Sequence, residues 1–198
     1  MGGEYTGIPM SDPKSYLSPA EISGIIKATD KDEYKRLFYI IAKTGRRVSE
    51  IVRCLRPADI DFENNLANFT ILKRKAKTRI LLPVDEKAIK VLKRQIRNNK
   101  IGDDDYIFGM SRQRADQVFK KSAERIGLFE RGTGLYRKMH IHMLRHSFAK
   151  LGAEHAKNPA DLVKLQKLLG HSRIDTTMFY LKFNPKEERE LLKEMWKV

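Results

Sequence analysis

Five places in the chain combine a charged or acid–base side chain with an ordered local setting: residues 44–50, residues 73–77, residues 140–146, His171 and Tyr180. Their residue types suit chemistry at phosphorus. Arginines can hold a phosphodiester, a lysine and histidines can move protons, and a tyrosine hydroxyl can attack phosphorus. Each residue taken singly is more simply explained as a solvated charge or a core side chain. The hypothesis of a catalytic site therefore depends on the combination.

The first two places are a helix start and a hairpin loop. Gly45 ends one predicted helix, and Arg46 and Arg47 precede the next, with Glu50 one turn after Arg47. The basic run 73–77 separates two predicted strands, so we expect it to form a hairpin loop that binds phosphate. Its cations are Lys73, Arg74, Lys75 and Lys77.

The histidine-rich segment allows two interpretations. His142 and Arg145 share one face of a predicted helix, which would let them act on one group. His140, His142 and His146 could instead hold zinc, since two histidines at i and i+4 can chelate a metal. No cysteine accompanies them, nor a glutamate at the metalloprotease spacing, and we expect no metal.

Charge and composition limit the function classes. Lys plus Arg number 40 against 25 for Asp plus Glu, a net charge of +15 in 198 residues. Such a field attracts nucleic acid first and anionic membrane second, while the plain alternative is lysine that serves solubility. Cys54, the single cysteine, excludes an intrachain disulfide and a Cys-based zinc site, and we expect it to be buried. No apolar run approaches the roughly 18 residues of a membrane span, so we expect a cytoplasmic protein.

The elements that would position these residues are mostly helical. Capping signals and apolar periodicity predict one ordinary domain, mainly α with a small antiparallel β-sheet. We expect an arm or linker over 1–17, a main domain over 18–183 and a C-terminal helix over 184–198, which docks on its own domain or on a neighbouring protomer. The predicted helices begin near Pro19 and span 32–43, 48–56, 86–96, 111–126, 141–156, 162–169 and 186–197, with a short helix around Tyr180, and the predicted strands are 66–72 and 79–82.

Three motifs occur in an order that resembles the catalytic domain of the tyrosine recombinase (phage integrase) family. The resemblance spans most of residues 18–198 and implies the fold of that catalytic domain. The motifs are Thr44-Gly45-x-Arg47-x-Ser49-Glu50, His142-x-x-Arg145-His146-Ser147-Phe148-Ala149 and Leu168-Leu169-Gly170-His171-Ser172-x-x-x-Thr176-Thr177-x-x-Tyr180.

The resemblance also implies roles for residues that hold the phosphate. Arg47 and Arg145 would bind the scissile phosphate, and Glu50 would support them. His142 and His171 stand at the positions of the family's two histidine-type site residues. Arg46 and the remaining hairpin cations would contact DNA.

The resemblance assigns the nucleophile and the general acid as well. Tyr180 would attack phosphorus and form a 3′-phosphotyrosine link. The family's lysine lies on the hairpin in a Lys-Gly-x-Lys pattern, and counting back from Pro83 favours Lys75. An alanine replaces the glycine of that pattern here, so Lys73 and Lys77 stay open as alternatives.

The function that follows is a site-specific DNA recombinase or integrase that needs no cofactor, acts on double-stranded DNA and self-associates as a dimer or tetramer on it. The alternatives are strand relaxation of the type IB topoisomerase kind and a catalytically silent DNA-binding protein of the same fold. Full-length members carry an N-terminal core-binding domain, and the residues before the first predicted helix are too few to form one. The resemblance implies a prokaryotic, archaeal, viral or plasmid origin.

Overall fold

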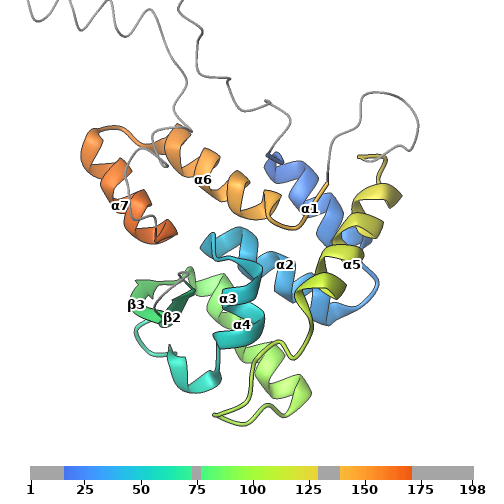
Figure 1. Ribbon diagram of the computed structural model, residues 1–198, viewed down its shortest axis with the longest axis horizontal. Helices are drawn as coiled ribbons and strands as arrows, with labels where there is room; N and C mark the ends of the chain where they lie inside the picture. The colour runs from blue at the N-terminus through green and yellow to red at the C-terminus, as the bar shows by residue number, and fades with distance from the viewer. Residues whose placement is uncertain (1–15, 73–76, 129–138, 171–198) are drawn as a thin grey trace, which may run out of the picture.

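The computed structural model of the chain describes residues 16–72, 77–128 and 139–170, with the side chain of Lys77 outside the description (Figure 1). These ranges form a helical body with a small sheet at one side. The helices and strands are α1 (Pro19–Ala28), α2 (Asp32–Thr44), α3 (Val48–Cys54), the 3-10 helix η1 (Pro57–Asp59), β1 (Ile60–Asp61), β2 (Leu66–Leu72), β3 (Lys77–Pro83), α4 (Glu86–Asn99), α5 (Arg112–Arg125), α6 (Met143–His155) and α7 (Pro159–Leu169).

Local sequence signals explain most helix ends. The Ser18 hydroxyl accepts a hydrogen bond from the backbone N–H of Glu21, and the Glu21 carboxylate accepts one from the backbone N–H of Ser18. This reciprocal capping begins α1 as predicted. α7 starts at Pro159, because Asn158 caps it. α6 starts later than predicted, because residues 141–142 form a turn before it.

The sheet is antiparallel with the strand order β1-β2-β3. β2 and β3 pair from Leu66 with Pro83 to Leu72 with Lys77, so Lys77 of the basic run belongs to β3 and residues 73–76 connect the two strands. Alternate residues of β2 are buried, as expected for a strand with one face on a core. The two-residue strand β1 was not predicted, because two residues carry no periodic signal.

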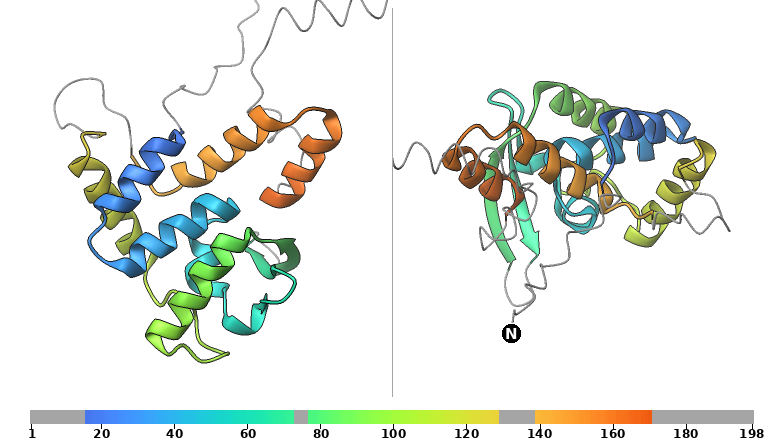
Figure 2. Two further views of the ribbon diagram at one scale, coloured as in Figure 1. Left: turned by 180° about the vertical axis from the view of Figure 1, so that it is seen from behind. Right: turned by 90° about the horizontal axis from the view of Figure 1, so that it is seen from above.

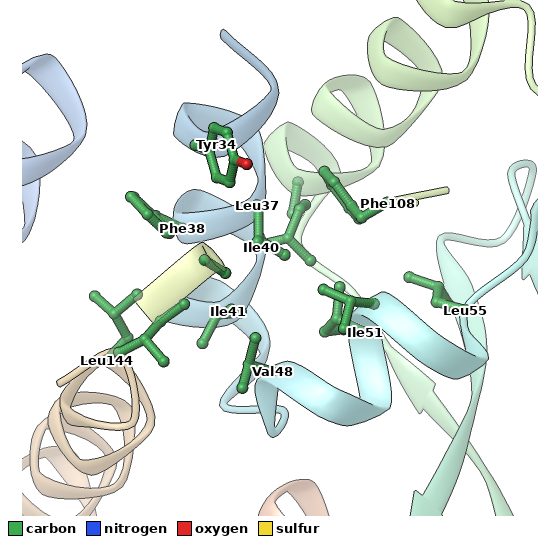
Figure 3. Packing of buried hydrophobic residues seen from close by; sticks show 14 of the residues in the cluster. Tyr34, Leu37, Phe38, Ile40, Ile41, Val48, Ile51, Leu55, Phe108 and Leu144 are labelled. Atoms are coloured by element: carbon green, nitrogen blue, oxygen red, sulfur yellow. The ribbon is translucent and has the colours of Figure 1, made fainter. Parts of the chain in front are cut away.

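The main core forms around α2. Its side chains Leu37, Phe38, Ile40 and Ile41 are buried, and α2 contacts α1, α4, α5 and α6 (Figure 3). From α6, Leu144 reaches this core, which places the start of α6 beside the end of α2. The site residues near both helix ends therefore belong to one packed body.

A second, smaller core joins α6 to α7. It consists of Ala149, Ala153, Leu165 and Leu169, with Phe148 packed against it. Figure 2 shows α7 beside the hairpin of β2 and β3, and residues of both elements line one groove. Cys54 is half-buried at the end of α3, so the expectation of full burial was wrong. Within the described ranges, the helices are too short or too polar to cross a membrane.

Candidate active site

The junction between α2 and α3 is shaped by a glycine. Gly45 follows α2 with φ of 63°, a left-handed conformation that glycine adopts at low cost. The ring of Phe148 lies so close that a Cβ at this position would come within 2.5 Å of it. The chain therefore reverses tightly enough for Arg46 and Arg47 to lead straight into α3.

Arg47 is oriented by Glu50. One carboxylate oxygen, Oε1, accepts from Nη1 of Arg47 at 2.8 Å, and Oε2 accepts from the Arg47 backbone N–H at 3.0 Å. The Glu50 side chain is fully buried, whereas 37% of the Arg47 side chain is exposed. This pair uses one of several guanidinium donors, so Arg47 is held in place with further N–H groups facing solvent.

Arg145 links two helix ends that lie far apart in the sequence. Its Nη1 donates to the carbonyl of Gly45 at 2.6 Å, and its Nη2 donates to the carbonyl of Leu169 at 2.8 Å. The side chain is almost fully buried. Neutral carbonyls fix the guanidinium without cancelling its charge, so Arg145 still favours an anion nearby.

His142 directly precedes α6 and stays neutral at physiological pH. Its pKa is lowered from 6.5 to about 3, mainly by burial and further by His146, Arg145, His140 and Arg47. The rings of His142 and His146 meet edge to face with 4.7 Å between centroids. A neutral imidazole can accept a proton, which is the form that a general base requires.

The three histidines do not form a metal site in this structure. Their ring centroids are 4.7, 6.3 and 6.4 Å apart. Among the described residues, no three His, Cys, Asp or Glu side chains are arranged to hold a metal ion. Burial also lowers the pKa of His146, with smaller effects of His140 and Arg145. The cluster is thus a set of packed imidazoles beside two arginines.

A groove of about 330 Å³ opens beside Arg47 and His142. The first turn of α5 also lines it, through Arg112 and Gln113. The groove therefore joins three elements: the start of α3, the start of α6 and the start of α5. Its lining includes two arginines, Arg47 and Arg112, which suit an anionic ligand.

The sequence interpretation missed the α5 residues. The signal that could have found them is the pair of arginines, Arg112 and Arg114, in a first helical turn that has no acidic residue. The helix dipole does not favour cations at a helix N-terminus, and of this pair only Arg112 lines the groove. Asp116 fixes this turn in place, because its Oδ1 accepts from the backbone N–H of Ile141 at 2.8 Å.

Arg46 differs from the prediction that it contacts DNA. Its side chain is 0% exposed, so in this conformation it reaches no surface where DNA could lie. Its Nη2 donates to the carbonyl of Leu168, and its guanidinium lies 5.5 Å from the ring centroid of Phe69. Burial lowers its pKa from 12.5 to about 10. Arg46 is an interior residue.

A sequence profile described as the phage integrase family matches residues 15–187. This range includes both arginines, the histidines and Tyr180. The chain belongs to the phage integrase family. The resemblance inferred from the three motifs is thereby confirmed.

Relatives in bacteria and archaea agree with this assignment. The tyrosine recombinase XerC of Xanthomonas axonopodis pv. citri is 36% identical over 152 residues, which is 74% of this chain and 45% of that protein. The tyrosine recombinase XerA of Pyrococcus furiosus is 32% identical over 186 residues, 92% of this chain and 62% of that protein. The chain thus spans about half to three fifths of the length of these relatives.

Solved structures share the fold. A XerA recombinase crystal structure aligns with a TM-score of 0.67 at 22% identity, over 92% of this chain and 64% of that one. The Tn1549 transposon integrase in complex with transposon right end DNA gives a TM-score of 0.73 at 20% identity, over 95% of this chain and 68% of that one. The predicted fold class, mainly α with a small antiparallel sheet, is confirmed as that of phage integrase catalytic domains.

The structure brings together part of the family's expected site. Arg47 and His142 line one groove, Glu50 holds Arg47 from the interior, and buried Arg145 acts on His142 and binds the end of α7. Lys77 begins β3, but only its backbone is described. The remaining predicted site residues lie outside the described ranges, and their roles stay predictions: Lys73, Arg74, Lys75, His171 and Tyr180.

Proposed function

We propose that this chain is the catalytic domain of a site-specific DNA recombinase that cleaves and rejoins strands through a 3′-phosphotyrosine on Tyr180. The observation that carries the proposal is the arrangement of Arg47 and Arg145 around a neutral His142. Glu50 and backbone carbonyls hold the two guanidiniums in fixed positions, and both cations act on the neighbouring His142 ring. A phosphodiester has the charge and the oxygens that two such guanidiniums bind.

The arginines act on the phosphate. Their charges stabilise the negative charge that grows on the non-bridging oxygens in the transition state. Because Glu50 holds Arg47, and two backbone carbonyls hold Arg145, neither side chain has to be ordered when DNA binds. Such preorganised groups lower the barrier more than mobile ones would.

Cleavage by this route requires two proton transfers. A tyrosine hydroxyl has an ordinary pKa of about 10 and is a weak nucleophile at neutral pH. We propose that neutral His142 takes the proton of Tyr180 as the bond from its oxygen to phosphorus forms. The bond from phosphorus to the 5′ oxygen breaks, and Lys75 gives that oxygen a proton. The phosphotyrosine conserves the bond energy, so a second 5′ hydroxyl can reverse the step and rejoin strands.

The proposed partner is double-stranded DNA, on which protomers assemble as dimers or tetramers. Support comes from the net charge of +15 and from the basic first turn of α5 at the groove. The structural neighbours XerH and the Tn1549 integrase were solved with their own DNA. We propose that residues 184–198 dock within their own protomer or on a neighbouring one, and that residues 1–17 serve as an arm. We also propose that the protein acts inside a bacterial or archaeal cell. Alone, this chain should bind DNA weakly and with strong salt dependence.

Replacing Tyr180 with Phe tests the nucleophile. The variant and the unchanged chain are each incubated with nicked suicide DNA carrying a candidate recombination site, and covalent adducts are resolved on a denaturing gel. We expect adducts only with tyrosine present, while DNA affinity stays the same because the ring is kept. Adducts that persist with phenylalanine at this position would refute the assignment.

A matched control and a second substrate complete this experiment. Tyr39→Phe changes a tyrosine of α2 that packs against the core outside the groove and should leave adduct formation intact. A paired-site substrate distinguishes recombination from simple relaxation of supercoiled DNA. Crossover products that require two sites are expected, and relaxation without crossover would favour the topoisomerase-like alternative.

A further inference from the structure

Arg46 is a buried cation that the proposed chemistry does not use. Its side chain is 0% exposed, and among the described residues its Nε and Nη1 have no hydrogen-bond partner. Burying a charge with incomplete hydrogen bonding is costly, and an apolar residue of similar size is often at least as stable there. A buried arginine at this position is therefore an expensive way to stabilise the fold as a whole.

What the guanidinium does contact is the carboxyl end of α7. Its Nη2 donates to the carbonyl of Leu168 in the last turn of that helix. A Cβ placed on Gly170 would lie 3.5 Å from Nη1, so the guanidinium also reaches the residue at which α7 ends. A cation at a helix C-terminus is favoured by the helix dipole and by the carbonyls left without helical partners.

The other face of the guanidinium packs on the sheet. Its central carbon lies 5.5 Å from the ring centroid of Phe69, a buried residue of β2. The same β2 contributes Ile71, whose Cδ1 would be 3.0 Å from a Cβ on Gly170. Arg46 thus fills the space between the strand that leads to the hairpin lysines and the helix that leads to His171.

Two guanidiniums share the end of α7. Arg145 donates to the carbonyl of Leu169, the residue next to the one that Arg46 binds. Arg145 belongs to the proposed phosphate site. The end of α7 is therefore held by Arg145, which belongs to that site, and by Arg46, a buried residue close enough to Glu50 and Arg47 to be affected by their charges.

We propose that Arg46 is a positioning residue that fixes the carboxyl end of α7 against β2 and so sets where the chain continues into His171. It acts through Leu168 and Gly170 and touches no DNA. Its effect on strand cleavage rests on the proposed function, whereas its effect on α7 does not.

The test compares Arg46→Met with Arg53→Met in the full chain. Arg53 is an exposed arginine of α3, so its replacement removes the same charge without touching α7. Hydrogen–deuterium exchange of the α7 amides is measured without DNA, with α4 as the internal reference. Thermal unfolding, DNA affinity against salt concentration and single-turnover cleavage of a nicked substrate are measured in parallel.

For Arg46→Met we expect exchange at the end of α7 to rise about tenfold, because one charge-assisted hydrogen bond is lost. The melting temperature should stay equal or rise, since methionine fills the same volume without a buried charge. Cleavage should slow by about tenfold while DNA affinity and its salt dependence match those of Arg53→Met. Arg46→Lys, which keeps the charge but lacks the planar fork, should give an intermediate exchange rate.

Unchanged exchange in α7 would overturn the proposal whatever the enzyme does. A second outcome would also overturn the proposal: Arg46→Met binds DNA more weakly and with a smaller salt dependence, but cleaves at the normal rate when DNA is saturating. That result would mean that Arg46 contacts a DNA phosphate directly. If the unchanged chain forms no adduct, the proposed function fails, and the exchange measurement still decides the role of Arg46.

Discussion

The two cores of this protein hold their helices by different means. Around α2, large side chains such as Phe38 and Ile40 interlock, and α2 shares one apolar interior with the four helices that it contacts. At α7, the smaller core is made of two alanines and two leucines, and the end of the helix is held by arginine bonds to its carbonyls. The body is fixed by burial, which is non-directional, whereas α7 is fixed by a few directional bonds.

Because of this difference, the residues proposed to bind phosphate and the helix that precedes His171 are held in place by different interactions. Arg47 and Glu50 are anchored by the body alone, whereas Arg145 donates both to Gly45 in the body and to Leu169 at the end of α7. His171 and Tyr180 follow α7 in the sequence, beyond Gly170.

The largest effect should follow from opening the main core. Phe38→Ala removes a fully buried ring that meets Phe119 edge to face at 5.4 Å. We expect the free energy of unfolding to fall by about 3–5 kcal/mol, measured by urea denaturation with circular dichroism.

The same variant tests whether the two cores are separate. Exchange should rise in α2, α4 and α5 together, because they share one interior. Leu165→Ala in the smaller core serves as the matched comparison and should raise exchange in α7 far more than in α4. Equal exchange patterns in the two variants would contradict the division into two cores.

A smaller effect should appear on acidification, through His142. Its folded pKa of about 3 lies below the ordinary value of 6.5, so the unfolded chain binds a proton first as the pH falls. Because the folded protein keeps this imidazole neutral while the unfolded chain gains a proton, the free energy of unfolding falls progressively from about pH 6.5 downward. Between pH 7 and pH 5 this single group should cost up to about 2 kcal/mol.

The measurement compares His142→Gln with the unchanged chain by urea denaturation at pH 7 and at pH 5. The glutamine variant should lose less stability on acidification, by the amount that His142 contributes. His155→Gln is the control, because His155 is exposed near the end of α6. A pH dependence that is identical in all three proteins would mean that His142 does not stay neutral in the fold.

The smallest effect on overall stability should come from Gly152, where α6 and α7 touch. A Cβ there would lie 2.5 Å from Cδ1 of Leu165, the end of a flexible side chain that can turn away. For Gly152→Ala, the gain in helix propensity partly offsets this crowding, and unfolding should change by less than about 1 kcal/mol. Exchange in α7 should nevertheless rise.

A double variant sharpens this prediction. Combining Gly152→Ala with Leu165→Ala removes the crowded methyl groups, so the two substitutions should be non-additive. Additive changes in α7 exchange would show that the close approach of α6 and α7 at Gly152 does not control the position of α7.

Elements with strong local signals could be predicted from the sequence. The capping box at Ser18 and the left-handed glycines at 45 and 170 set helix ends where they were expected. Arg47, His142 and Arg145 could be selected because their motifs occur in the family's order. Strand β1 and the turn before α6 could not be predicted, because such short segments take their conformation from strand pairing and from packing against the rest of the protein.

The sequence by itself determined which residue types are available and, through its motifs, the family to which they belong. Only the tertiary structure decided what neighbouring arginines do. Arg46 and Arg47 are adjacent and chemically identical, yet one is 0% exposed beneath α7 and the other lines a groove. The physical reason is that the Phe69 ring packs against Arg46 and the Leu168 carbonyl accepts its hydrogen bond. Both residues are distant from Arg46 in the sequence and meet it only after folding.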